Sequence, residues 1–193
     1  MTKKSGFFTR IKLLNFEQKM IFATALTERM LPNYQLFSQA TEFGEPKVLN
    51  VIVDIIWQKL SKHSVKLNIE VQLDKLAEQI PEQRDFDCFG VIPAIDCAMS
   101  VNTLLVALEQ QIEDDLINAS KLSSSTVASY ITAVEGDISD EATFSHEMMT
   151  EEKALQEYLL ERVEQNANPN AAFLKELRAE FNAFGISNIG IER

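Results

Sequence analysis

The chain has 193 residues, of which 46% are hydrophobic, a share that is typical of a globular protein. Its net charge is −11, from 18 basic and 29 acidic residues. This acidic balance argues against a protein that binds nucleic acid through the phosphate backbone, because such binding needs a basic surface.

The N-terminal segment is basic and amphipathic. Residues 1–12 contain no acidic residue and carry Lys3, Lys4, Arg10 and Lys12. The charges of this segment interrupt the apolar run that a secretory signal needs, and no stretch approaches the roughly 18 apolar residues of a membrane span. We therefore expect a cytoplasmic protein without a transmembrane segment. Its first helix, which begins at Phe7, is expected to fold onto the core; an arm that lies on a lipid surface is the alternative.

Nearly every later segment repeats its apolar residues with the 3.6-residue period of a helix. A helix that begins at Phe16 is expected to end before Pro32, because proline cannot continue the backbone hydrogen bonds. Asn33 is then expected to cap a short helix that stops at Gly44. Glu45 to Leu60 follows as a very apolar helix.

Residues 65–71 form the one ambiguous segment. Apolar residues from Val65 to Leu73 alternate with polar ones, as they do in a strand. The apolar residues from Ile69 to Ile80 also fit a helical stripe with Asn68 as its N-cap, and no other segment alternates to supply a partner strand. We therefore predict a helix that Pro81 ends.

The longest unbroken helical pattern runs from Asp85 to Ala119 and is expected to form the central helix. Its first half is apolar on nearly all sides, which is typical of a helix buried among others. The remaining sequence predicts helix starts at Ser125, Ser139, Thr150 and Asn168-Pro169, then an extended or irregular tail from Ile186 to Arg193. About eight helices with short connections predict an all-α fold, a single compact bundle formed as one domain by residues 1–193.

Several catalytic chemistries lack the residues that they need. The six glycines form neither a GxxxxGK[ST] nor a GxGxxG phosphate-binding pattern. Neither histidine, His63 or His146, follows a glutamate by three residues, as a dinuclear carboxylate site in a bundle would require. Cys88 and Cys97 lack zinc-ligand spacing and are interpreted as reduced, small core residues. We expect no metal site and no cofactor, and we interpret His146 as a surface residue.

Two apolar helices each carry one narrow polar stripe. The stripe around Asp54 includes Lys47, Asn50, Gln58 and Ser61. The stripe around Asp96 continues through Ser100, Thr103, Gln110 and Asp114. Each stripe could face water, form hydrogen bonds inside the bundle, or line a cleft shared by both helices that holds a polar ligand.

Glu28 and Arg29 form the other charged feature within an apolar segment. At the expected helix end, the positive charge of Arg29 would interact favourably with the helix dipole, and Glu28 could pair with a basic residue. We prefer a buried structural ion pair over a catalytic acid here, and we expect Trp57 to pack in the core. The candidate ligand-binding residues are thus Glu28, Arg29, Asp54 and Asp96, and no catalytic residue is assigned.

A series of short motifs occurs in order along nearly the whole chain: Glu28-Arg29-Met30-Leu31-Pro32-Asn33-Tyr34, Ile56-Trp57, Asp85-Phe86-Asp87, Pro93-Ala94-Ile95-Asp96, Leu177-Arg178-Ala179 and Ser187-Asn188-Ile189-Gly190-Ile191. In these motifs the chain resembles the YjaG-like family of bacterial proteins, known as domain of unknown function 416. The resemblance implies a small, cytosolic, all-helical bacterial protein. It implies no activity, substrate, cofactor or catalytic residue.

The leading functional hypothesis is a non-enzymatic module that binds a protein partner or a second copy of itself. The alternative is an enzyme or small-molecule binder whose polar pocket between helices is built on Glu28, Asp54 and Asp96. A third class, an acidic protein that mimics nucleic acid, would require the acids of Glu109–Asp115 and Glu147–Glu164 to share one continuous face.

Overall fold

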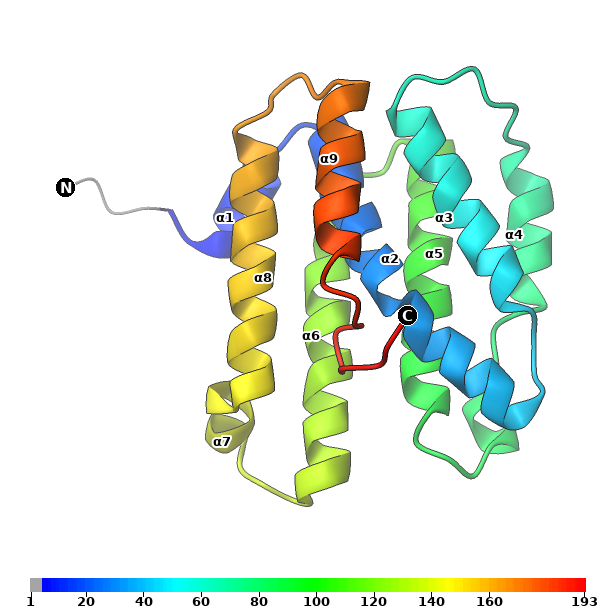
Figure 1. Cartoon of the computed structure of the whole chain (residues 1–193), viewed down its shortest axis with the longest axis vertical. Coiled ribbons are helices and arrows are strands. Elements are labelled where there is room, and N and C mark those ends of the chain that lie inside the picture. The colour runs from blue at the N-terminus through cyan, green and yellow to red at the C-terminus, as the bar shows by residue number, and fades with distance from the viewer. Residues whose placement is uncertain (1–4) are drawn as a thin grey trace.

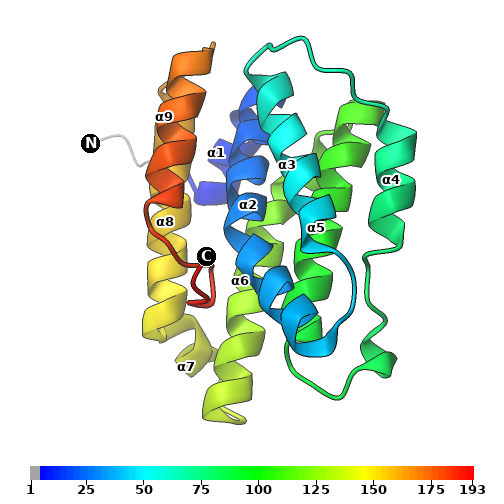
Figure 2. The ribbon, with the colours of Figure 1, turned by 45° about the vertical axis from the view of Figure 1, so that its right-hand side comes forward.

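Two long helices, α2 and α5, contact each other at the centre of the bundle, and most other helices pack on one or both of them. In the computed structural model, which describes residues 5–193, α3 and α4 lie on one side of this pair and α6 and α8 on the other (Figures 1 and 2). The elements are α1 (Phe7–Leu13), α2 (Phe16–Thr41), α3 (Pro46–Leu60), α4 (Ile69–Ala77), the 3₁₀ turn η1 (Gln83–Asp85), α5 (Val91–Gln110), α6 (Asp114–Glu135), α7 (Asp140–Ser145), α8 (Glu147–Glu164) and α9 (Ala171–Asn182).

The all-α fold class is confirmed. Among residues 5–193 the extended pairing is limited to one isolated bridge between Ile186 and Glu192, within the tail that was expected to be extended or irregular. The ambiguous segment forms the helix α4, as predicted, and the Asn68 side chain caps it by accepting a hydrogen bond from the backbone N–H of Val71 at 3.2 Å.

The prediction that a helix ends before Pro32 is wrong, because α2 continues through this proline to Thr41. Pro32 has no N–H to donate to the carbonyl of Glu28, one turn earlier. The guanidinium of Arg193 donates to that carbonyl instead, at 3.4 Å. Asn33 consequently caps no helix, and its side chain donates to Asn188 Oδ1 in the tail. Figure 2 shows that α2 changes direction along its length.

The pattern from Asp85 to Ala119 is not one helix. It divides into α5 and the first turns of α6, and the chain reverses at Gln111, whose φ of 56° is left-handed. A non-glycine residue adopts this conformation at a cost of only about 1–2 kcal/mol, so no glycine or proline marks the break in the sequence. The central position expected for the apolar half is confirmed, since α5 contacts α2, α3, α4 and α6.

The later helix starts are partly as predicted. Ser139 caps α7 as expected, but Ser125 lies inside α6, because that helix already begins at Asp114. Helix α8 begins before Thr150, and α9 after Asn168-Pro169. Their first-turn N–H groups are satisfied by other side chains, namely His146 Nδ1 for α8 and Asn170 Oδ1 for α9.

The expectation that the first helix folds onto the core is confirmed for α1. Ile11 is fully buried, and Arg10 is buried in ion pairs with Glu157 and Glu164 of α8. Lys3 and Lys4 lie outside the described residues. Arg10 is thus held by two carboxylates, and they raise its pKa against the opposing effect of burial.

Buried apolar side chains form one large cluster and one small one. The large cluster joins α1–α6, α8 and α9, and it contains Trp57, which is buried as predicted. The small cluster joins the later turns of α6 to the start of α8 and the tail, through Val127, Ile131, Met149 and Ile189. The tail is therefore part of the packed structure.

Helix α5 is, by length and composition alone, long and apolar enough to cross a membrane. It is the one helix of this kind in the described part of the chain. More than half of its apolar stretch is buried by neighbouring helices, and the core helix of a bundle meets the same criterion.

The turn between α2 and α3 depends on Gly44. Its φ is +69°, and a Cβ at this position would collide with the hydroxyl of the buried Tyr34. That hydroxyl donates to the carbonyl of Gln79 at 2.8 Å, so the ring cannot move without losing a hydrogen bond.

We predict that Gly44→Ala destabilises the protein by about 1–3 kcal/mol more than Gly185→Ala does. Gly185 is a matched control because it has the same φ of +69° but open space around the added Cβ. Urea unfolding of both variants measures the difference. Equal losses of stability would show that the left-handed backbone, and not the contact with Tyr34, makes glycine necessary.

Candidate functional site

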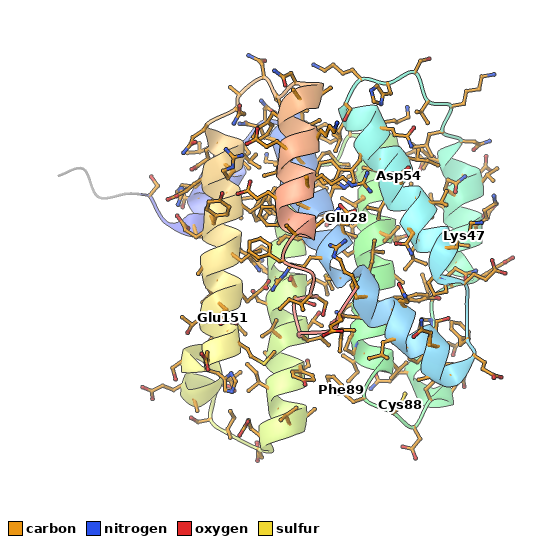
Figure 3. All side chains as sticks on the ribbon, in the orientation of Figure 1. Glu28, Lys47, Asp54, Cys88, Phe89 and Glu151 are labelled. Atoms are coloured by element: carbon orange, nitrogen blue, oxygen red, sulfur yellow. The ribbon has the colours of Figure 1, made fainter. Side chains whose placement is uncertain are left out.

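Arg178 of α9 joins two of the four candidate residues. Its Nε and Nη2 donate to Glu28 Oε1 at 3.1 and 3.0 Å, and its Nη1 donates to Asp54 Oδ1 at 2.8 Å. Glu28 is buried in the middle of α2, whereas Asp54 on α3 is half exposed. Figure 3 shows Glu28 and Asp54 close to each other where α2, α3 and α9 meet. The arrangement joins three helices through one guanidinium.

Trp57 completes the surroundings of Glu28. Its indole N–H donates to Glu28 Oε2 at 2.7 Å, and the guanidinium of Arg178 lies 5.8 Å from its ring centroid. A buried carboxylate needs such partners to remain ionised. The arginine and the indole together bind both carboxylate oxygens of Glu28 within the chain. The expected buried ion pair is confirmed for this residue.

Asp54 is bound from two sides. Arg178 donates to one carboxylate oxygen, and Gln58 of the next helical turn donates to the other at 2.7 Å. The hydrogen bond from Arg178 is the main reason why the pKa of Asp54 is lower than its ordinary value, although partial burial opposes it. The rest of its polar stripe includes the exposed Lys47 and Asn50, so this end of the stripe faces water.

Arg29 follows Glu28 in α2 but contacts the other side of the bundle. Its guanidinium donates to Glu152 of α8, and both side chains are buried. Ser123 and Gln156 each donate to the second carboxylate oxygen of Glu152 at 2.6 Å. The buried ion pair is therefore confirmed, whereas the helix-dipole argument for Arg29 is wrong, because α2 does not end here.

The tail joins this second polar cluster. Asn188 donates from its side chain to the carbonyl of Ser123 at 3.1 Å and accepts from Asn33 of α2 at 2.8 Å. These three residues are all buried. The tail is thus held to α2 and α6 through side-chain amides.

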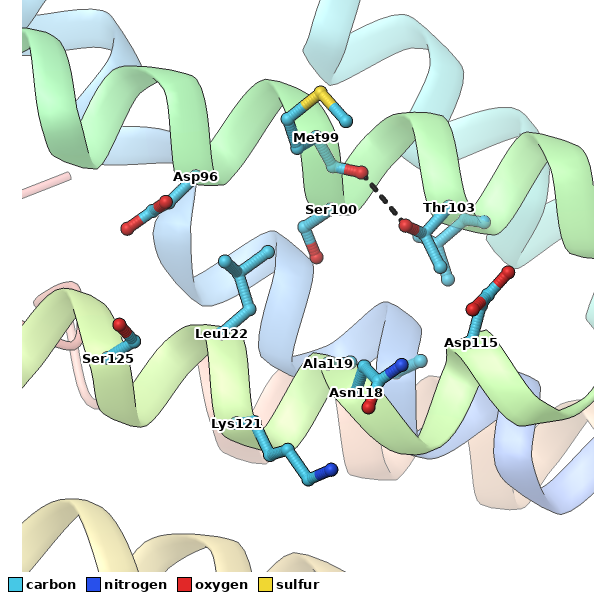
Figure 4. A pocket seen from close by; sticks show the side chains of 12 residues that line it. Asp96, Met99, Ser100, Thr103, Asp115, Asn118, Ala119, Lys121, Leu122 and Ser125 are labelled. Carbon is cyan, nitrogen blue, oxygen red and sulfur yellow. Dashed lines mark hydrogen bonds between the residues drawn. The ribbon is translucent and has the colours of Figure 1, made fainter.

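Asp96 does not join the cluster around Glu28. Its carboxylate accepts a hydrogen bond from Thr126 of α6 at 2.7 Å, and burial raises its pKa. It lines a cleft of about 500 Å³ between α5 and α6, which Figure 4 shows together with Ser100, Thr103 and Asp115. The residues that line this cleft come from α2, α5 and α6 and none comes from α3, so the stripe of Asp54 does not reach it.

The polar stripe of α5 has several roles. Ser100 is buried and forms a hydrogen bond of 2.6 Å with Thr27 of α2, whereas Thr103 donates to the carbonyl of Met99 in its own helix. Part of the stripe therefore forms hydrogen bonds inside the bundle, and part lines the cleft beside α6 (Figure 4).

The thiols and histidines do not form a nucleophilic pair. Cys97 is buried as expected, and burial raises its pKa. The interpretation of Cys88 as a core residue is wrong, because it is exposed in the loop before α5. Ser145 donates to the carbonyl of Glu141, while His146 caps α8. Within residues 5–193, no group of three or more His, Cys, Asp or Glu side chains is arranged to hold a metal ion.

The chain is thus an all-α bundle whose polar interior is formed by buried ion pairs. A sequence profile of a protein family of unknown function, DUF416, matches residues 6–192. The chain belongs to this family, which confirms the resemblance seen in its motifs.

Known proteins agree with this assignment. The chain is 34% identical to the uncharacterized protein YjaG of Escherichia coli K12 over 184 residues, or 94% of each chain. It is 32% identical to an uncharacterized protein of Haemophilus influenzae over 95% of each chain. The crystal structure of a DUF416 family protein from Shewanella baltica is 49% identical, with a TM-score of 0.93 over 98% of this chain and all of the other.

Sequence reasoning missed the partners of the candidate residues. Arg178 and Glu152 lie on helices with many other charged residues, and their spacing does not distinguish them. Arg178 did occur in a motif that carried the family resemblance, and Trp57 in another. The motifs therefore held a signal for the cluster around Glu28, but they did not reveal its geometry.

We predict that Glu152→Gln lowers the free energy of unfolding by about 3–5 kcal/mol, because it leaves the buried Arg29 charge without a counter-charge. The matched control is Glu176→Gln, which removes the exposed ion pair with Arg162 and is expected to cost less than about 1 kcal/mol. Urea unfolding at neutral pH compares the two. A similar small loss for both variants would contradict the buried pair.

The two aspartates are predicted to respond to pH in opposite directions. Because the pKa of Asp54 is lowered, its ionised form favours the folded state, and Asp54→Asn should destabilise the protein at neutral pH. Because the pKa of Asp96 is raised, its ionised form disfavours the folded state, and Asp96→Asn should stabilise it.

The Asp54 difference should fade as the pH falls below about 4, where an unfolded aspartate becomes protonated. The Asp96 difference should fade as the pH falls toward about 4 and be absent below it, because the folded state binds this proton at a higher pH than the unfolded state does. Urea midpoints of the wild type and the two variants, measured across this range, test the signs. If both variants change the stability in the same direction at neutral pH, the opposite pKa shifts of the two aspartates are contradicted.

Proposed function

We propose that this protein is a non-catalytic interaction module that binds a segment of a protein partner in an apolar groove between α6 and α8. The α6–α8 groove, as we call it, has a volume of about 790 Å³. Its walls include Phe8 of α1, Ala128 of α6, Phe144 of α7 and Met149 of α8. Figures 1 and 2 show α7 at one end of the α6–α8 pair and α1 nearer the other.

The single observation that carries this proposal is the exposure of large apolar side chains around the groove. Phe144 is 60% exposed and Phe8 is 43% exposed. Isolated apolar residues on a surface need no explanation, but a hollow lined by several of them is typical of a binding site.

The state of the acidic residues also supports binding over catalysis. Glu28 and Asp54 are engaged with Arg178, and Asp96 accepts from Thr126 in a separate cleft. A general acid or base must be free to exchange a proton with a substrate. A polar catalytic pocket built on these three residues is therefore less well supported than the α6–α8 groove.

The acidic surface needed for nucleic-acid mimicry is also poorly supported. Glu152 faces the interior, where it pairs with Arg29, while Glu157 and Glu164 are bound to Arg10. These carboxylates belong to the segment expected to provide the acidic face, and their charges are compensated within the chain.

In-cell photo-crosslinking tests the proposal. A photoreactive amino acid at Ala154, an exposed position that lines the groove and not the cleft of Asp96, is expected to yield a discrete adduct with a partner protein that mass spectrometry identifies. The same amino acid at the exposed Lys66, remote in sequence from every groove residue, should not.

Phe144→Ser in the protein labelled at Ala154 should remove the adduct, because it shortens the apolar wall without altering the buried core. No adduct at Ala154, or equal adducts at Ala154 and Lys66, would overturn the proposal. An adduct between two copies of this chain would change the partner to a second copy.

A further inference from the structure

We infer that the segment bound in the α6–α8 groove is an amphipathic helix of a partner protein whose apolar stripe is flanked by acidic side chains. This inference rests on the proposed function and adds the conformation and the charge of the partner. Three observations lead to it: a helix that already packs on the same pair of helices, the length of the uncovered groove, and two lysines on its walls.

The first observation concerns α1, which packs on the same pair of helices. It contacts α6, and its Arg10 binds Glu157 and Glu164 of α8. The pair formed by α6 and α8 therefore already accepts one short amphipathic helix through aromatic and charged contacts. The groove is the part of the same surface between α1 and α7 that remains uncovered; α1 contributes Phe7 and Phe8 to its walls, and α7 contributes Phe144.

The second observation is the length of the groove. On α6 its lining extends from Ser120 to Ala128, and on α8 from Met149 to Glu157. At a rise of 1.5 Å per residue, each wall is roughly 12 Å long, or a little more than two helical turns. A helix that lies along the groove could insert side chains at positions i, i+4 and i+7, which is the usual spacing of anchors in helix-in-groove recognition.

The third observation is the charge of the walls. Lys121 lies over the ring of Phe8 at 5.7 Å, and Lys153 lies over the ring of Phe144 at 5.0 Å. Lys153 also donates to the carbonyl of Phe144 at 2.9 Å. In the described part of the chain neither ammonium group is paired with a carboxylate. The acidic residue of the lining, Glu157, is bound to Arg10.

Together these contacts place two positive charges beside apolar rings, on opposite walls of the groove. The chain as a whole carries a net charge of −11, so this local excess of positive charge is a departure from its average. Acidic residues beside the apolar stripe of a partner helix would meet Lys121 and Lys153, whereas basic ones would be repelled. The charge pattern therefore selects an acidic partner.

Three synthetic peptides test the inference. Each has the same leucine stripe at i, i+4 and i+7 and is longer than the roughly 15 residues below which isolated helices are marginal. The flanking positions are all Glu in the first, all Gln in the second and all Lys in the third. Fluorescence anisotropy with the full-length protein measures their affinities.

We expect the Glu peptide to bind about tenfold more tightly than the Gln peptide, as two exposed ion pairs allow, and the Lys peptide to bind more weakly than both. The double variant Lys121→Gln/Lys153→Gln should remove the preference for Glu over Gln. The matched control, Lys66→Gln/Lys175→Gln, changes the same net charge at exposed positions outside the groove and should preserve the preference.

The outcomes separate this inference from the proposed function. Equal binding of the three peptides, or a preference that the Lys121/Lys153 variant retains, would overturn the acidic partner while the α6–α8 groove remains a protein-binding site. If none of the peptides binds although crosslinking at Ala154 yields a partner, the inference that the partner segment is a helix is wrong. If dodecanoate binds the wild type but not the Phe144→Ser variant, and no peptide binds, the groove is a site for small amphiphiles and not for a protein segment.

Discussion

Two adjacent charged residues in the middle of α2, Glu28 and Arg29, must each be neutralised inside the bundle. An isolated buried charge costs several kcal/mol, so α2 can occupy the centre only if a counter-charge lies on both of its sides. Arg178 of α9 supplies it for Glu28, and Glu152 of α8 supplies it for Arg29. The positions of α8 and α9 relative to α2 follow from this requirement.

A missing backbone hydrogen bond at Pro32 connects the tail to the bend of α2. Pro32 leaves the carbonyl of Glu28 without its helical partner, and Arg193 donates to that carbonyl. Asn33, one residue later, binds Asn188. Pro32 would otherwise weaken a buried helix. The C-terminal tail, which lies against α2 in Figure 1, therefore stabilises α2 at this proline.

The charged residues of the interior and those of the α6–α8 groove differ in what they can still bind. In the interior, partners within the bundle already bind Glu28, Arg29 and Glu152. A ligand would have to displace these partners, which would leave a buried charge unpaired. Lys121 and Lys153 are exposed and lie over aromatic rings. A partner can therefore reach them without disturbing the fold, which is why a binding role is better placed at the surface groove than in the polar interior.

The sequence by itself determined the all-α fold class, the family and the prediction of buried ion pairs at Glu28-Arg29, because helical periodicity and short motifs are local properties. Only the tertiary structure identified the partners, since Arg178 lies 150 residues from Glu28 and Glu152 lies 123 residues from Arg29. It also decided that α2 continues through Pro32 and that the central pattern breaks at Gln111. Both depend on contacts and backbone conformations that no local pattern encodes, as does the groove, which packing alone forms between α1, α6, α7 and α8.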